Sequence, residues 1–180
     1  MEYTIIRSRR KSLAIEITPR GEVLIRAPLR LAKKDIHRFV ESKQEWIANH
    51  LSKVSAVTPL TAKEHKALIL AAKEALSSKA AFYAQALDVT FCRVTIRSQH
   101  TRWGSCSASG NLSFNCLLML APEEIQDYVV VHELCHRKQM NHSPAFWAEV
   151  EQILPDFRSR KAWLKEHGAS LLAQLPDIQK

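Results

Sequence analysis

Two histidines separated by three residues, with a glutamate beside the first, form the segment of this sequence with the clearest chemical meaning. The segment reads His132-Glu133-Leu134-Cys135-His136. In an α-helix, positions i and i+4 lie on the same face about one turn apart, so both imidazoles can bind one metal ion. The Glu133 carboxylate is then placed to hold a water molecule without binding the metal. The motif predicts a catalytic zinc site, one ion per chain, with Glu133 as general base.

Zinc would supply two effects at such a site: it lowers the pKa of a water molecule and polarises the carbonyl of the substrate. Glu133 would accept the proton of that water and deliver it to the leaving group. The helix that carries the motif is expected to be buried, because it is rich in large apolar residues at Ile125, Tyr128, Val129, Val130 and Val131. Histidines on a buried face need partners, since an unpaired buried polar group costs about 1–3 kcal/mol. The less favoured alternative is a pair of core histidines bonded to the backbone.

A catalytic zinc ion usually has three protein ligands and one open position. His142 is the favoured third ligand, because it lies six residues after His136, just beyond the helix end expected at Met140-Asn141. The chain can turn back there and bring the imidazole to the metal. Glu149 and Glu151 are the rival candidates, as carboxylates from a following helix.

The four cysteines favour free thiols over a cysteine-based metal site. They are Cys92, Cys106, Cys116 and Cys135, and no two of them form a CxxC pair. Cysteine-based zinc sites normally use closely spaced pairs. In a reducing cytosol, such cysteines are most simply buried side chains.

The elements that must position these residues change type along the chain. Apolar and polar residues alternate over residues 3–28, around a turn at Pro19-Arg20-Gly21, which predicts a small antiparallel sheet. From about Ala32 to Val54 the apolar residues recur at three and four, as in an amphipathic helix. Thr61 and Glu64 then form a capping box at the start of a long helix that reaches about Leu87.

The second half of the chain returns to strands before the motif helix. Residues 90–97 alternate as a strand, and a turn at Ser109-Gly110 precedes a second strand from Leu112 to Leu118. Pro122 opens the motif helix. The sequence therefore predicts an α+β protein, with an N-terminal β-rich lobe and helix over residues 1–58 and a catalytic core with a small sheet over 59–180. One compact domain over the whole chain is the alternative.

Motif-flanking residues extend the match to a known family. The chain resembles the YgjP-like metallopeptidase family, a relative of the WLM and SprT-type zincins, over residues 3–167. The matching segments are His132-Glu-Leu-Cys-His136, Asn141-His142-Ser143-Pro144, Phe146-Trp147, Arg102-Trp103-Gly104-Ser105-Cys106, the strand with Asn115, Arg9-Arg10-Lys11-Ser12, and the Trp46-Ile47 helix. This resemblance implies a zincin-like core, zinc on His132, His136 and His142, and a catalytic Glu133. The substrate does not follow from the resemblance alone.

Two further residues of these segments are candidates for substrate binding. Arg102 and Asn115 are expected to contact the substrate, with Arg102 stabilising an oxyanion; the alternative for Arg102 is a structural ion pair. The strand after Gly110 is expected to pair with an extended substrate. Phe146 and Trp147 are expected to pack against the motif helix.

The chain is strongly basic, with a net charge of +8 and a pI near 9.5. The densest cluster of positive charge comprises Arg7, Arg9, Arg10 and Lys11, with Lys33 and Lys34 further along. Such charge is compatible with nucleic-acid binding. The favoured interpretation is nevertheless a solvated surface, because no helix-turn-helix, zinc-finger or RNP-type pattern accompanies it.

Hydropathy predicts neither a membrane span nor a secretory signal. No segment approaches 18 consecutive apolar residues. The N-terminal residues lack a long apolar core, and their basic residues follow the short apolar stretch instead of preceding it. We therefore expect a cytoplasmic protein without a membrane partner.

Three functions are compatible with these residues. The first is a zinc-dependent peptidase acting on peptides or unfolded protein segments. The second is a zinc-dependent hydrolase of nucleotides or another non-peptide substrate, helped by the basic surface. The third is a nucleic-acid-associated module with a structural metal, whose fourth ligand would be Cys106 or Cys116. Glu133 favours an enzyme, because a closed structural site has no use for a carboxylate beside an open position.

Overall fold

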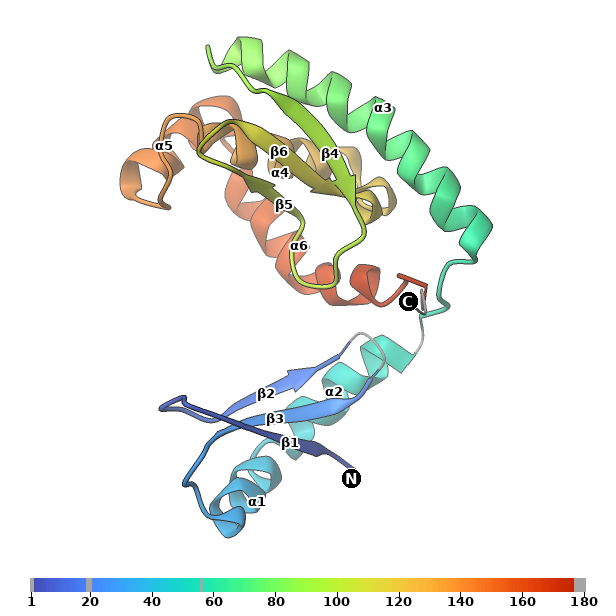
Figure 1. The fold of residues 1–180 in the computed structure, drawn as a ribbon, viewed down its shortest axis with the longest axis vertical. Helices are drawn as coiled ribbons and strands as arrows, with labels where there is room; N and C mark the ends of the chain where they lie inside the picture. The colour runs from blue at the N-terminus through green and yellow to red at the C-terminus, as the bar shows by residue number, and fades with distance from the viewer. Residues whose placement is uncertain (1, 19–20, 56, 177–180) are drawn as a thin grey trace. The chain divides into compact units, whose positions relative to one another are not determined.

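The computed structural model describes residues 2–18, 21–55 and 57–176. Contacts within the chain divide it into two compact units, Met1–Thr58 and Pro59–Lys180 (Figure 1). Each unit combines a three-stranded sheet with helices. The predicted α+β class is therefore confirmed.

The first unit contains a mixed sheet and two helices. Its strands are β1 (Thr4–Ser8), β2 (Ala14–Ile17) and β3 (Val23–Pro28), in the order β1-β3-β2. Helices α1 (Lys33–Glu41) and α2 (Gln44–Ser55) follow. The buried core of the unit consists of Val23, Ile25, Ala27, Ile36, Val40 and Ile47.

Two expectations for this unit are corrected. The sheet is not wholly antiparallel: β2 and β3 pair antiparallel, but β1 and β3 pair parallel. Successive strands alternate in direction, so placing β3 in the centre makes its second neighbour, β1, run the same way. The single helix expected from Ala32 to Val54 is divided at Ser42-Lys43, where the Ser42 hydroxyl donates to the Phe39 carbonyl. Of the expected turn, only Gly21 lies in the described residues, with a φ of +80°.

The second unit begins with a long helix and a second mixed sheet. Helix α3 (Ala62–Ala86) starts with the predicted capping box of Thr61 and Glu64. Strands β4 (Arg93–Arg97), β5 (Gly104–Cys106) and β6 (Asn111–Asn115) form a sheet in the order β4-β6-β5. Strand β6 pairs parallel with β4 and antiparallel with β5.

The remaining elements of this unit are helical. They are the 3-10 helix η1 (Cys116–Leu120) and the α-helices α4 (Glu123–Cys135), α5 (Pro144–Ile153) and α6 (Phe157–Leu172). The strand expected up to Leu118 ends at Asn115, because the Asn115 side chain accepts a hydrogen bond from the Leu117 amide and starts η1. The motif helix also ends earlier than expected, with His136 at its C-cap.

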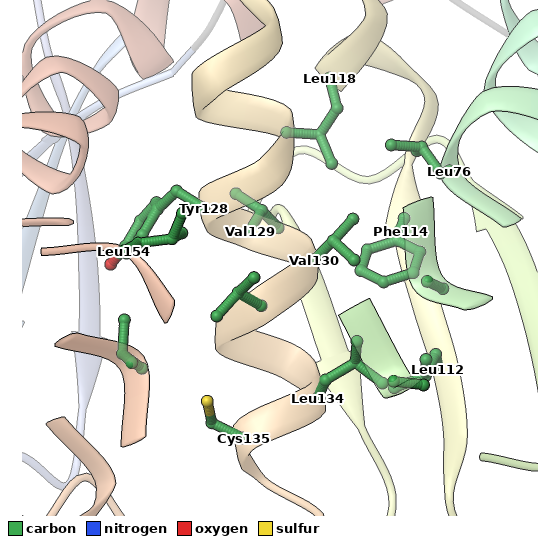
Figure 2. Packing of buried hydrophobic residues seen from close by; sticks show 14 of the residues in the cluster. Leu76, Leu112, Phe114, Leu118, Tyr128, Val129, Val130, Leu134, Cys135 and Leu154 are labelled. Carbon is green, nitrogen blue, oxygen red and sulfur yellow. The ribbon is translucent and has the colours of Figure 1, made fainter. Parts of the chain in front are cut away.

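Helix α4 is surrounded by apolar side chains. Figure 2 shows Leu112, Phe114 and Leu118 on one side of the helix and Leu154 on the other. Val130 and Leu134, on α4 itself, are fully buried. This packing fixes the position and rotation of the helix, and with them the positions of the motif side chains. No helix of the described residues combines the length and the apolar character needed to cross a membrane.

Candidate metal centre

Three histidines converge at the end of α4. His132 lies in the last turn of the helix, His136 is its C-cap, and His142 lies in the loop before α5. One ring nitrogen from each lies within 4.8 Å of the others. The Nε2 atoms of His132 and His142 are only 3.0 Å apart. The structure therefore brings the three predicted ligands to one point.

The chemistry of this cluster fits a divalent cation. His136 Nδ1 lies 3.0 Å from the Gln139 carbonyl, so it donates there and leaves Nε2 as a lone-pair ligand. Within the described part of the chain, the buried Nδ1 of His132 has no hydrogen-bond partner. A shared cation would give the facing His132 and His142 nitrogens a common partner. Three imidazoles with room for a fourth ligand match a catalytic zinc site.

The rival ligands are engaged elsewhere. Glu149 forms an ion pair with Lys138 at 2.9 Å, and Glu151 forms one with Arg158. Among the residues that the structure describes, the cluster contains no carboxylate or cysteine. Cys116 is fully buried and contacts the Ser98 hydroxyl. The arrangement is thus the one expected if the fourth position is open, not closed by a protein ligand.

An aromatic layer supports the imidazoles from α5. Phe146 is fully buried, and its ring centroid lies 4.6 to 4.9 Å from those of the three histidines. Trp147 stacks on Phe157, and the Lys161 ammonium lies 4.0 Å from the Trp147 ring centroid. The expectation that Phe146 and Trp147 pack against the motif helix is confirmed. This packing restricts the rotation of the imidazole rings.

Glu133 is held by a direct contact with the backbone of β5. Its side chain is 6% exposed and lies against Gly104. A Cβ atom at Gly104 would be 2.6 Å from both Cγ and Oε1 of Glu133, which is too close for any real contact. Only glycine therefore fits beside this carboxylate. The sequence pattern does not reveal this role, although the glycine lies within the Arg102–Cys106 segment that resembles the family.

Substituting Gly104 with alanine is expected to destabilise the metal-free protein by about 1–3 kcal/mol, the usual cost of overpacking a filled site. The cause would be the collision with Glu133, so the cost should largely vanish when Glu133 is already alanine. Urea unfolding of wild type, both single variants and the double variant measures this coupling. Additive effects of the two substitutions would contradict the proposed contact.

Burial controls the ionisation of the site in the absence of a metal. It raises the pKa of Glu133 from 4.5 to about 8, with the Arg102 charge opposing the shift. Burial also lowers the pKa of His132 from 6.5 to about 3, assisted by the neighbouring positive charges. The pKa of His142 is lowered by the same causes. At neutral pH the metal-free site therefore favours a protonated Glu133 and neutral imidazoles at His132 and His142, the form in which histidine binds metals.

These shifts predict a pH dependence for the stability of the metal-free protein. Above pH 4.5 the folded chain holds the Glu133 proton that the unfolded chain releases, so stability falls with pH up to about 8. His132 has the opposite effect between about 3 and 6.5, and the two slopes offset each other where they overlap. Only the Glu133 slope remains between 6.5 and 8, at most about 1.4 kcal/mol per pH unit. Unfolding of chelator-treated protein across this window should show the slope, and Glu133→Gln should remove it. An equally steep slope in the variant would contradict the assignment.

The histidines and Glu133 open into a cleft of about 360 Å³. The residues that line it are Arg102, Gly104, Ser105, Cys106, His132, Glu133, His136, Met140 and His142. Strand β5 forms one wall and is an edge strand of its sheet, with one side unpaired. The expectation that the strand after Gly110 pairs with substrate is wrong, because β6 is the central strand and both its edges are occupied. The edge that remains free beside the cleft is that of β5.

The two expected substrate-binding residues lie in different places. Arg102 lines the cleft and acts electrostatically on Glu133. Asn115 is 2% exposed and does not line the cleft. Its amide donates to the carbonyls of Gln99 (2.6 Å) and Arg102 (3.1 Å). Its oxygen is also bonded, to the Leu117 amide, so the Asn115 side chain supports the loop that carries Arg102.

A comparison with family models matches this chain to one family. The model described as YgjP-like, metallopeptidase domain, matches residues 11–69 and 60–167. A search of the curated proteins finds no match. The family implies a metal-dependent hydrolase with a peptide or protein substrate, and it gives no support to a nucleotide substrate.

Two similar solved structures are metallopeptidase zymogens. Abylysin from Pyrococcus abyssi has 22% identity and a TM-score of 0.46, covering 51% of this chain and 93% of its own. Jannalysin from Methanocaldococcus jannaschii has 18% identity and a TM-score of 0.45, covering 51% and 94% respectively. Similarities of this size assign no function to the present chain.

Proposed function

We propose, since this chain belongs to the YgjP-like metallopeptidase family, that it is a zinc-dependent peptidase. His132, His136 and His142 would hold one zinc ion, and Glu133 would act as general base. The observation that carries the proposal is the convergence of the three imidazoles within 4.8 Å in a cleft that Glu133 also lines. A structural zinc site would need neither the cleft nor the carboxyl.

When bound, zinc would polarise the carbonyl of the scissile bond and lower the pKa of a water molecule. Glu133 would orient that water and accept its proton. A bound cation would oppose the effect of burial on Glu133, as the Arg102 charge does, and would favour the carboxylate that a base requires. Glu133 would then donate the proton to the departing nitrogen, so that the amine leaves as a neutral molecule and not as an amide anion.

Arg102 is proposed to stabilise the charge that develops on the carbonyl oxygen during attack. It lines the cleft, and no ion pair of its guanidinium is found among the described residues. Arg102→Ala is therefore expected to lower kcat by about 100-fold with little change in KM, as for other oxyanion-stabilising donors. Steady-state kinetics of the alanine and lysine variants measure this, with partial recovery expected for lysine. A change confined to KM would assign Arg102 to ground-state binding instead.

The unpaired edge of β5 is the feature that favours an extended peptide as substrate. An unpaired strand presents backbone N–H and C=O groups that can pair with a peptide, which gives affinity without requiring a particular sequence. Gly104, Ser105 and Cys106 form this strand, and all three line the cleft. Peptides and unfolded segments present an extended strand more readily than a folded protein, whose backbone groups are mostly paired. We therefore propose peptides and unfolded protein segments as the substrate class.

The test uses the zinc-loaded full-length chain with three substrates: an alkylated, unfolded protein, the same protein in its folded form, and a mixture of nucleoside triphosphates. Cleavage of the unfolded protein alone is expected, detected by mass spectrometry of the fragments. A chelator should abolish the cleavage and added zinc should restore it. Phosphate release from the nucleotides without peptide cleavage would replace this proposal with the nucleotide hydrolase.

A further inference from the structure

The positive charge of the chain is concentrated in its first unit. Residues 1–58 contain 12 of the 26 Lys and Arg residues but only 6 of the 18 Asp and Glu residues. This unit therefore carries +6 of the net charge of +8 in about a third of the chain. The metal centre lies in the other unit, so its chemistry does not explain this concentration.

The sheet topology brings the basic residues to one end of the unit. Strands β1 and β3 are parallel, and their last residues, Ser8 and Pro28, are register partners. The segments that follow the two strands consequently begin side by side. Arg7, near the end of β1, connects this strand to the segment after β3. Its guanidinium donates hydrogen bonds to the carbonyls of Pro28 (3.1 Å), Leu29 (2.9 Å) and Leu31 (2.8 Å). The basic edge, as we name it, comprises Arg9, Arg10 and Lys11 after β1, and Arg30, Lys33 and Lys34 after β3.

The charges of the basic edge are available to a ligand. All six side chains are exposed except Arg10, which is half-buried. In the described ranges, none of the six forms an ion pair with a carboxylate. Helix α1 also begins here, and its N-cap residue, Ala32, makes no side-chain cap. The first-turn amides of α1 therefore add to the positive potential.

Of the six acidic residues of the unit, Glu41 ends α1 and Glu45 lies in the first turn of α2. Asp35, in the first turn of α1, is the one carboxylate close to the basic edge in sequence. Glu2 precedes β1 and Glu22 precedes β3, which places both at the opposite end of the sheet. Glu16 is paired with Arg26. Among the described residues, the two ends of the sheet therefore differ in charge, as expected for a surface that binds a polyanion.

An aromatic groove lies in the same unit. Ile15, Phe39, Lys43 and Trp46 line a hollow of about 200 Å³. Trp46 is 43% exposed, and its ring stacks on His50 at a centroid distance of 3.9 Å. Strand β2, which carries Ile15, starts at the same end of the sheet as the basic edge, since Ala14 pairs with Arg26. The groove thus combines an exposed aromatic ring with a cation, Lys43, in the unit that carries the basic edge, a combination typical of surfaces that stack unpaired bases.

From these observations we propose that residues 1–58 form a binding surface for single-stranded nucleic acid. The basic edge contacts the phosphates, and the groove at Trp46 receives a base. A strand of nucleic acid provides both ligands at once: a regular row of charges and flat, unpaired rings. An anionic membrane or an acidic polypeptide offers the charge without the bases. The proposal concerns a different unit from the metal centre and stands independently of the peptidase activity.

The test measures binding of the full-length chain to a labelled single-stranded oligonucleotide of about 20 nucleotides, longer than the usual binding site. The triple variant Arg9→Glu, Lys11→Glu, Lys34→Glu is expected to bind at least about 100-fold more weakly at low salt. The slope of log K against log salt should fall in magnitude by about 2, for three lost phosphate contacts. The matched control is Lys66→Glu, Lys73→Glu, Lys165→Glu, which makes the same change of charge at exposed positions of the other unit. The control should retain most of the affinity and the full slope.

A second variant separates single strands from charge alone. Trp46→Ala should weaken single-strand binding by about 10-fold, as expected for the loss of one stacked base, and leave the salt slope and duplex binding unchanged. Circular dichroism and thermal unfolding verify that each variant is folded. The proposal is overturned if the wild-type chain does not bind the oligonucleotide, or if both triple variants lose affinity equally. Equal competition by polyglutamate or by anionic vesicles would also overturn it.

Discussion

Replacing Glu133 with glutamine is expected to lower kcat/KM for peptide cleavage by about 1000-fold, within the range of general acid–base catalysis. Glutamine has the same shape as glutamic acid but cannot accept a proton from water. The side chain is 6% exposed and its pKa in the metal-free chain is raised to about 8, so the buried group is already neutral at pH 7 before metal binds. A neutral amide is therefore tolerated there, and the variant should fold and retain zinc.

The control for this experiment is Glu166→Gln, which makes the same chemical change at an exposed position. It should leave kcat/KM unchanged. Zinc content and thermal unfolding are measured on both variants beside the wild-type chain. Cleavage by the Glu133 variant at the wild-type rate, with zinc bound, would remove Glu133 from the mechanism.

Removing His142 is expected to weaken zinc binding by more than about 100-fold, because even the residues that merely orient metal ligands contribute 10–100-fold. His142 comes from the loop before α5, and its Nε2 lies 3.0 Å from that of His132. Two ligands from one helix, His132 and His136, would remain. Titration with a competing chelator measures the affinity of wild type and His142→Ala, and cleavage activity should decline with it.

The matched control is His100→Ala, which removes an exposed imidazole that does not belong to the cluster. It should bind zinc as tightly as the wild-type chain. Glu149→Gln tests the rival ligand in the same assay, and no loss is expected because Glu149 is paired with Lys138. Loss of zinc in the Glu149 variant together with retention in His142→Ala would assign the third ligand to the carboxylate.

The parts of the fold that depend only on residues close together in the sequence could be predicted from it. The capping box at Thr61 and Glu64 and the motif helix follow from local patterns. The central position of β3 could not be predicted, because apolar alternation is the same in parallel and antiparallel strands. The end of β6 differs from the expectation for another reason. Cys116 to Leu120 are as apolar as a buried strand, but they form a 3-10 helix that the Asn115 side chain caps.

The candidate site likewise combines features that local sequence predicts with features that depend on contacts between distant parts of the chain. The spacing of His132 and His136 on one helix predicts their shared face, and the loop to His142 is short enough to limit where that side chain can lie. The contact between Gly104 and Glu133 joins β5 to α4, elements far apart in the sequence, so no local pattern reveals it. The same holds for Asn115, whose partners at Gln99 and Arg102 depend on how the loop folds back on β6.

The most direct test of the central claim, a zinc site formed by three histidines, is the metal content of the purified full-length chain, determined by mass spectrometry after zinc supplementation. The structure predicts about one zinc ion per wild-type chain, since one cluster of three histidine nitrogens lies within 4.8 Å in the described residues. The content should fall markedly in His142→Ala and stay unchanged in His100→Ala. If the wild-type chain binds no metal even with excess zinc, His132 and His136 are core residues and the peptidase proposal is wrong.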